Sequence, residues 1–170
     1  MPQVVASGVA EAASIRVPAI AFRHRPGYLH TAADVRAAYP SGIDGRHLVW
    51  MWRRILEVVG FAHRSGWAHG ALALDHLVVA ARDHGVLVVG WSNAKGTSAS
   101  ASLADVALSA ALVRSLSDGA LPPPLAEVMT AAAAGAHADA WELAEVVGRA
   151  ARRSYGPPAF HPFSLPPFHR

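Results

Sequence analysis

The segment from His47 to Ser65 constrains the fold of this chain more than any other part of the sequence. Its apolar residues recur mostly at steps of three and four, the spacing of one face of an α-helix. They are Leu48, Met51, Trp52, Ile55, Leu56, Val59 and Phe61. Arginines and a glutamate fill the other side, and Gly66 ends the pattern. The segment therefore predicts an amphipathic helix inside a helical domain.

Composition narrows the class of protein. The chain has 170 residues, enough for one compact domain, and 52% of them are hydrophobic while 16% are charged, which argues against disorder. It contains no cysteine, which excludes a disulfide framework, a thiolate metal site and a cysteine nucleophile. No stretch approaches the roughly 18 apolar residues of a membrane span, and residues 1–14 lack the pattern of a secretion signal. We expect a cytoplasmic protein with no membrane partner.

Further elements are predicted around the long helix. Capping and breaking residues bound four more helices, which cover residues 32–39, 102–116, 122–134 and 138–153. Thr31 is expected to cap the first of them, and Ser102 with Asp105 resembles a capping pair for the second. Runs rich in β-branched residues at 77–80 and 86–90, joined by a glycine-containing turn, predict one small β-hairpin.

The fold class predicted from these patterns is mainly α, with about five to six helices and the one hairpin. Three parts are expected along the chain. Residues 1–26 form an N-terminal extension, partly disordered or a vestigial strand, in which Ile15 to Phe22 is an edge strand or an extended linker. Residues 27–153 form the helical lobe, and residues 154–170 form a tail rich in proline and phenylalanine.

Two short motifs stand at defined places in this order of elements. Residues 69–76 read HGALALDH and follow the long helix, and residues 90–92 read GWS and follow the hairpin. The arrangement resembles the C-terminal, helical lobe of eukaryotic-like protein kinases over roughly residues 27–153, where an H-[RG]-D-L-x-x-x-N loop and an Asp-Phe-Gly motif occupy these places. The resemblance implies an α+β family fold whose N-terminal lobe is missing or vestigial here. The upstream segment holds no glycine-rich phosphate loop and no V-A-I-K-type lysine.

The same resemblance implies that the phosphoryl-transfer residues are lost, as in a pseudokinase. Ala71 stands at the position of the base aspartate, and a methyl group accepts no proton. His76 stands at the position of the magnesium-binding asparagine, and imidazole is a poor ligand for this hard cation. Gly90 stands at the position of the metal-bridging aspartate and brings no charge. We therefore expect no catalytic residue and no cofactor; ATP and magnesium are expected only for a diverged kinase.

Four residues are expected to keep structural roles that the resemblance implies. Asp105 falls where kinases have a buried aspartate that accepts hydrogen bonds from the backbone of the catalytic loop. His69 falls at the packing histidine of that loop and is followed by Gly70. Trp91 is expected to fill the space between the hairpin and the helices rather than to stack on a base or cofactor.

Other interpretations of the polar residues carry less weight. The ten histidines show no H-E-x-x-H pattern, so no metal site is expected. Asp75 and His76 form a weak alternative catalytic pair, without a recognisable G-x-S-x-G nucleophile. The arginines are scattered and the net charge is only +3, so nucleic acid is not expected as a partner. Basic residues near the end of the last helix suit its dipole and a solvated face, namely Arg149, Arg152 and Arg153.

The tail leaves two interpretations open. Phe160, Phe163 and Phe168 lie among prolines. They form either a peptide motif for a partner or a strap that folds back over the helices.

The leading functional hypothesis is a pseudokinase-like scaffold or protein-interaction module. It binds a protein partner, or a second copy of itself, through the face left uncovered by the missing lobe. That face lies near Tyr28, Leu29 and the hairpin, where an apolar patch is expected. The alternative is a highly diverged kinase-family phosphotransferase or ATP-binding protein that uses Asp75 or residues of a partner chain. A third hypothesis is a truncated or decaying copy of a longer kinase-like protein.

Overall fold

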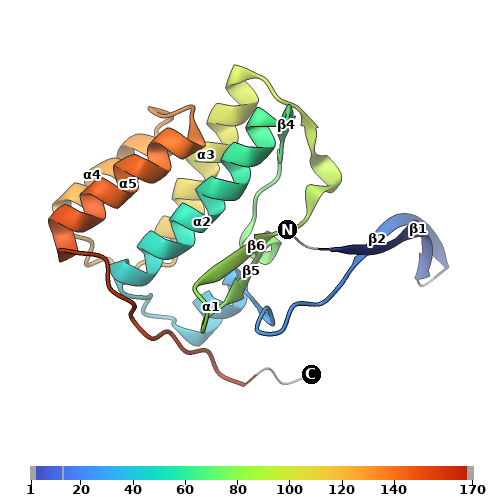
Figure 1. Cartoon of the computed structure of the whole chain (residues 1–170), viewed down its shortest axis with the longest axis horizontal. Coiled ribbons are helices and arrows are strands. Elements are labelled where there is room, and N and C mark those ends of the chain that lie inside the picture. The colour runs from blue at the N-terminus through green and yellow to red at the C-terminus, as the bar shows by residue number, and fades with distance from the viewer. Residues whose placement is uncertain (1–2, 13, 168–170) are drawn as a thin grey trace.

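The computed structural model describes residues 3–12 and 14–167, in which helices and small sheets alternate (Figure 1). The α-helices are α1 (Ala32–Ala38), α2 (Gly45–Arg64), α3 (Ala99–Arg114), α4 (Pro123–Ala133) and α5 (Ala140–Tyr155). Two 3₁₀ helices are present, η1 (Leu74–His76) and η2 (Trp91–Asn93). The strands are β1 (Val4–Ala12), β2 (Ile15–Phe22), β3 (His30–Thr31), β4 (Trp67–Ala68), β5 (Leu77–Ala80), β6 (Gly85–Val88) and β7 (Lys95–Gly96). They form antiparallel sheets in the orders β1-β2, β3-β5-β6 and β4-β7.

The prediction of a mainly α chain with one hairpin is wrong, because three small sheets accompany the five helices of the described residues. The predicted hairpin is present as β5 and β6, but β3 extends it and two further sheets exist. β3, β4 and β7 have two residues each, too few to show any alternation in the sequence. β1 consists largely of alanine, glycine and valine, and the low β-propensity of the first two hides the strand.

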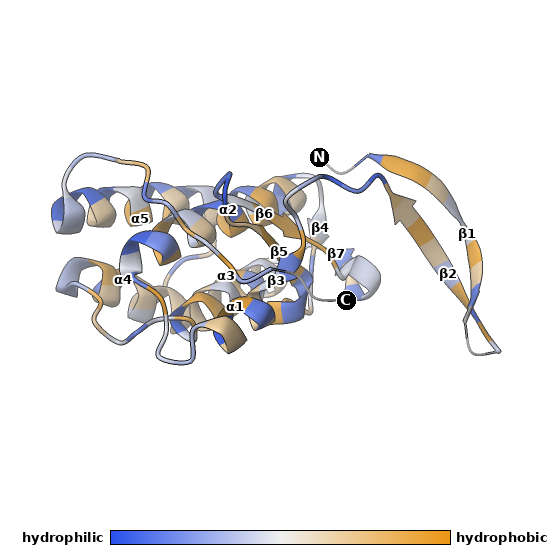
Figure 2. Cartoon of the chain, turned by 90° about the horizontal axis from the view of Figure 1, so that it is seen from below, coloured by the Kyte–Doolittle hydropathy of each residue, from blue (hydrophilic) through white to orange (hydrophobic). Residues whose placement is uncertain are grey.

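The sheet of β1 and β2 forms an arm that projects from the helical body (Figures 1 and 2). Its register runs from Val4 opposite Phe22 to Ala12 opposite Ile15. Of the two states foreseen for residues 15–22, the structure shows the strand. The arm stands where the kinase resemblance would put an N-terminal lobe in the sequence, and two strands are all that the described residues hold there.

α2 lies at the centre of the body, and its apolar face is buried against α3, α5 and the β5-β6 hairpin, except that Phe61, predicted to belong to this face, is 48% exposed. It begins at Gly45, two residues earlier than expected, because the Asp44 side chain caps it by accepting a hydrogen bond from the N–H of Arg46 at 2.7 Å. The opposite end packs on α5. There the Trp141 indole N–H donates to the carbonyl of Glu57 at 3.1 Å. None of the described helices has the length and hydrophobicity needed to span a membrane.

α3 begins at Ala99, so the prediction that Ser102 and Asp105 form its capping pair is wrong. Ser98 is the cap, and its hydroxyl accepts a hydrogen bond from the N–H of Ala101 at 3.2 Å. The sequence offers serines at several neighbouring positions, and their spacing alone does not select among them. Asp105 consequently lies inside the helix, with its carboxylate buried.

The C-terminal tail crosses the body as a strap, one of the two arrangements that the sequence left open. Phe163 is buried, with its ring centroid 4.6 Å from that of His47 and 5.6 Å from that of Tyr39. Phe160 is exposed and stacks on His84 at 4.3 Å. Phe168 lies outside the described residues. The strap therefore completes the core on the side of α1 and α2.

Replacing Leu56 by alanine tests whether α2 carries the core. Leu56 is fully buried, so Leu56→Ala should lower the free energy of unfolding by about 2 to 5 kcal/mol, through lost burial and the cavity that remains. Leu108→Ala on α3 is the matched control, because Leu108 is 38% exposed and its loss should cost less than about 1 kcal/mol. Urea denaturation followed by circular dichroism measures both. Equal costs would contradict this account of the core.

Candidate functional site

The carboxylate of Asp105 ties three elements together. Its Oδ2 accepts hydrogen bonds from the backbone N–H of His69 at 2.7 Å and from Nε2 of His63 at 3.0 Å. Its Oδ1 accepts a bond from the N–H of Gly70 at 2.9 Å. His63 belongs to α2, and the two amides belong to the loop after β4. Together the three bonds fix the HGALALDH loop to α2 and α3.

These bonds also set the charge of Asp105. Burial raises the pKa of its carboxyl, but the hydrogen bonds from His63, Gly70 and His69 outweigh burial and hold the pKa below its ordinary value. The group is therefore ionised at neutral pH. A carboxylate with three donors and a lowered pKa is a poor proton acceptor, so Asp105 is built to hold the loop and not to act as a general base.

Hydrogen bonds at both nitrogens fix the orientation of the His69 ring. Its Nε2 donates to the carbonyl of Val89 at 2.8 Å, while its Nδ1 accepts from the N–H of Ala71 at 3.3 Å. Trp91 packs on this ring at a centroid distance of 4.6 Å, and its indole N–H donates to the carbonyl of Val88 at 2.9 Å. Both rings thus join the HGALALDH loop to the end of the hairpin. Their polar atoms are occupied within the protein.

The His76 imidazole occupies the space that a side chain at position 90 would need. Gly90 has φ of 78°, and a Cβ added there would overlap the His76 imidazole. The imidazole is fixed in turn, because its Nδ1 donates to the carbonyl of Ala71 at 2.7 Å. A side chain as large as aspartate therefore has neither a suitable backbone conformation nor space at position 90 while His76 is present.

Asp75, the weak alternative catalytic residue, lies next to His76 in η1 but is exposed. No hydrogen bond joins it to His76 or to any other side chain among the described residues, and His76 bonds to Ala71 instead. Residues 3–12 and 14–167 contain no group of three or more histidine, aspartate or glutamate side chains placed to hold a metal ion. The loop thus brings together His69, His76, Gly90, Trp91 and Asp105, while Asp75 stays apart.

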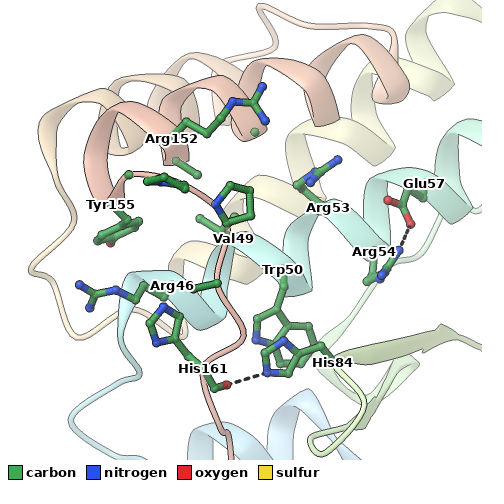
Figure 3. A pocket seen from close by; sticks show the side chains of 16 residues that line it. Arg46, Val49, Trp50, Arg53, Arg54, Glu57, His84, Arg152, Tyr155 and His161 are labelled. Atoms are coloured by element: carbon green, nitrogen blue, oxygen red, sulfur yellow. Dashed lines mark hydrogen bonds and ion pairs between the residues drawn. The ribbon is translucent and has the colours of Figure 1, made fainter.

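A second site was missed by the sequence analysis. A cavity of about 550 Å³ lies between α2, α5 and the tail, and four arginines line it (Figure 3): Arg46, Arg53, Arg54 and Arg152. The first three recur at helical spacing on one side of α2, a signal that the sequence did contain. Arg152 comes from a helix about 100 residues later, and no spacing rule places it beside them. We call this the arginine cavity.

Comparison of the sequence with protein-family models finds no family that matches, and comparison with curated proteins finds no significant relative.

Replacing Asp105 by asparagine tests the anchoring role. The amide cannot accept from all three donors, so Asp105→Asn should lower the free energy of unfolding at pH 7 by about 2 to 3 kcal/mol. Because the folded-state pKa is lowered, the stabilisation by wild-type Asp105 is present above the unfolded pKa of about 3.9 and is lost as the pH falls through the lower folded value. Urea denaturation at pH 7 and pH 3 should show the difference between variant and wild type shrinking in acid.

Asp75→Asn is the control for that experiment. Asp75 is exposed and has no side-chain partner, so its replacement should change the stability by less than about 0.5 kcal/mol at either pH. A difference for Asp105→Asn that stays constant between pH 7 and pH 3 would contradict the assigned charge.

Alanine substitutions at two glycines test the coupling of position 90 to His76. Gly66 has φ of 87° with nothing near its absent Cβ, so Gly66→Ala should cost about 1 to 2 kcal/mol from backbone strain alone. Gly90→Ala carries the same strain and also pushes against His76, so it should cost about 1 to 3 kcal/mol more. His76→Ala in the Gly90→Ala background should recover part of the difference. Thermal unfolding measures all three, and equal effects of the two glycine substitutions would argue against the coupling.

Proposed function

We propose that this chain is a catalytically inactive, protein-kinase-like scaffold whose arm docks another protein strand, in the first instance that of a second copy of the chain. The observation that carries the proposal is the exposure of the arm. Seven of the thirteen large apolar side chains that are exposed in the described residues lie on it: Val4, Val5, Val9, Ile15, Val17, Ile20 and Phe22. Figure 2 shows the arm, with its stretches of hydrophobic residues in orange, standing apart from the helices.

The architecture of the arm favours a partner. A two-stranded sheet is only marginally stable in water, and three or more strands with a covered face are needed for independent stability. β1 and β2 pair only with each other, so both outer edges offer unpaired N–H and C=O groups. Packing of two arms face to face would cover the same face of each, and a two-fold axis would supply the same contacts to both copies.

One face of the arm suits such an association. Residues directly opposite each other share a face, so Ala10 with Val17 and Gly8 with Ala19 lie together, and Ala6 with Ala21 continues the same face. This face carries no charge and holds the exposed large apolar residues Ile15 and Val17, whereas Val9 and Ile20 lie on the other face together with Glu11 and Arg16. Burial of apolar area of this kind stabilises by about 25 cal/mol per Å².

The docking surface differs from the one expected near Tyr28 and Leu29. Tyr28 is half-buried, with its hydroxyl over Gly85 of β6, and so covers the hairpin. Leu29 is exposed but is separated from other large apolar residues by the polar segment before it. The exposed apolar residues gather on β1 and β2 instead.

The inactive half of the proposal rests on the loop chemistry. Ala71, His76 and Gly90 stand at the three positions where kinases bring a base and metal ligands, and His76 fills the space beside Gly90. Losing a general base alone commonly costs about 10²- to 10⁴-fold in rate. The absence of carboxylates at these positions therefore favours a scaffold over a phosphotransferase.

Light scattering on the purified chain tests the docking role. We expect a concentration-dependent dimer that Val17→Lys dissociates, because a charge at the centre of the apolar face cannot be buried unpaired. Leu108→Lys is the matched control; it replaces an exposed leucine of α3 and should leave the dimer unchanged. A monomer at every accessible concentration, or equal effects of the two variants, would refute arm-mediated docking.

Thermal unfolding in the presence of ATP tests whether the chain is inactive. We expect no magnesium-dependent rise in the melting temperature, and such a rise would refute the proposal that the chain is catalytically inactive.

A further inference from the structure

We infer that the arginine cavity is a binding site for a small polyphosphate, an organic or inorganic molecule that carries two or more phosphate groups. This inference is independent of the arm and of the HGALALDH loop, since neither contributes a lining residue. The cavity volume of about 550 Å³ falls within the range of small-molecule sites, roughly 300 to 1,000 Å³.

The charge of the lining selects an anion. Four arginines and one glutamate, Glu57, line the cavity, which gives a formal charge of +3. Guanidinium groups bring paired donors that match phosphate oxygens, and they stay charged at any physiological pH. A cleft lined mainly by one sign of charge concentrates counter-ions of the other sign. A single phosphate would occupy only part of this donor set, so more than one phosphate group is indicated.

The protein itself neutralises these arginines incompletely. Arg54 is paired with Glu57 at 2.7 Å, and Arg46 is paired with Asp44 at 3.0 Å. Arg53 reaches Glu145 only at 3.8 Å, and that glutamate is largely exposed, so the pair is weak. Arg152 makes no ion pair or side-chain hydrogen bond with any described residue. Two of the four guanidinium groups thus keep donors for a ligand.

Arg53 has a hydrogen-bond donor for which the part of the chain that the structure describes provides no acceptor. Its Nε is buried and has no hydrogen-bond partner among the described residues, and its guanidinium lies against Gly148 of α5. A buried donor without an acceptor costs about 1 to 3 kcal/mol, and such groups are rare in folded proteins. The Arg53 side chain as a whole is 39% exposed, so a small rotation away from Gly148 would bring its Nε to a phosphate oxygen in the cavity.

The tail gives the site its closure. Residues 156–159 and His161 line the cavity on the side away from the helices, and the carbonyl of His161 accepts a bond from Nε2 of His84 at 2.8 Å (Figure 3). Trp50 stacks on the His84 ring at 4.5 Å, nearly parallel at 4°. The arginines therefore lie around a hollow that the strap partly covers, an arrangement that suits a small ligand better than a nucleic-acid backbone.

Calorimetric titration of the full chain with sodium tripolyphosphate, at constant ionic strength, tests the inference. We expect saturable binding of one molecule per chain, and Arg152→Gln should weaken it at least about tenfold, since charge-assisted hydrogen bonds are lost. Arg149→Gln is the matched control. It removes the same charge from the same helix, is exposed, and does not line the cavity, so it should change the affinity less than about twofold.

Three results would overturn the inference: no saturable binding, equal weakening by Arg149→Gln and Arg152→Gln, or tighter binding of a single-stranded RNA that both substitutions weaken equally. The Arg152 side chain has no ion-pair or hydrogen-bond partner among residues 3–12 and 14–167, so its replacement should leave the unliganded melting temperature unchanged. Arg53→Gln supplies a second variant with the same expected loss of affinity.

ATP itself carries three phosphate groups and can therefore bind to the arginine cavity. A stabilisation by ATP that needs no magnesium and disappears in Arg152→Gln is assigned to the cavity, whereas a magnesium-dependent stabilisation is assigned to the HGALALDH loop.

Discussion

The carboxylate of Asp105 is the interaction on which the arrangement of this protein depends. It receives one bond from α2 through His63 and two from the backbone of the following loop through His69 and Gly70. The loop has no regular secondary structure to satisfy those amides, and a buried amide without an acceptor is costly. Fixing them from α3 also places His69, and through it the Val89 carbonyl at the end of the hairpin. One ionised side chain thereby connects the central helix, the loop and the small sheet.

The same geometry explains why the shape of the loop does not depend on the side chain at position 71. Its conformation is held by bonds to backbone atoms and by ring packing, and neither requires a side chain at position 71. Position 90 is different, because His76 occupies the space that a side chain there would need. Restoring an aspartate at position 90 alone would therefore meet both an unfavourable φ and the imidazole, so the two positions can change only together.

How much of the fold the sequence predicts follows from the length and period of each pattern. α2 has five turns of clear amphipathic spacing, and the hairpin has two β-branched runs beside a turn, so both were predictable to within about two residues. The start of α3 was not predictable, because Ser98 and Ser102 are equally good caps in sequence and the spacing of the serines does not choose between them. The strand β1 was not predictable either, because its alanines and its glycine have little preference for strands. In the arginine cavity, only the three arginines of α2 left a readable spacing, since the fourth arrives through tertiary packing of α5.

The arm and the arginine cavity place different demands on the fold. The cavity is built from α2, α5 and the strap, all joined to the main core, so its arginines are held by elements that cannot move without cost to that core. The arm contributes no residue to the core, and its strands bond only to each other. Its loss or rearrangement would therefore leave the helical body intact, whereas its own order depends on what covers it. A rigid body that carries a separable apolar arm is an arrangement suited to holding a partner without transmitting strain to the rest of the molecule.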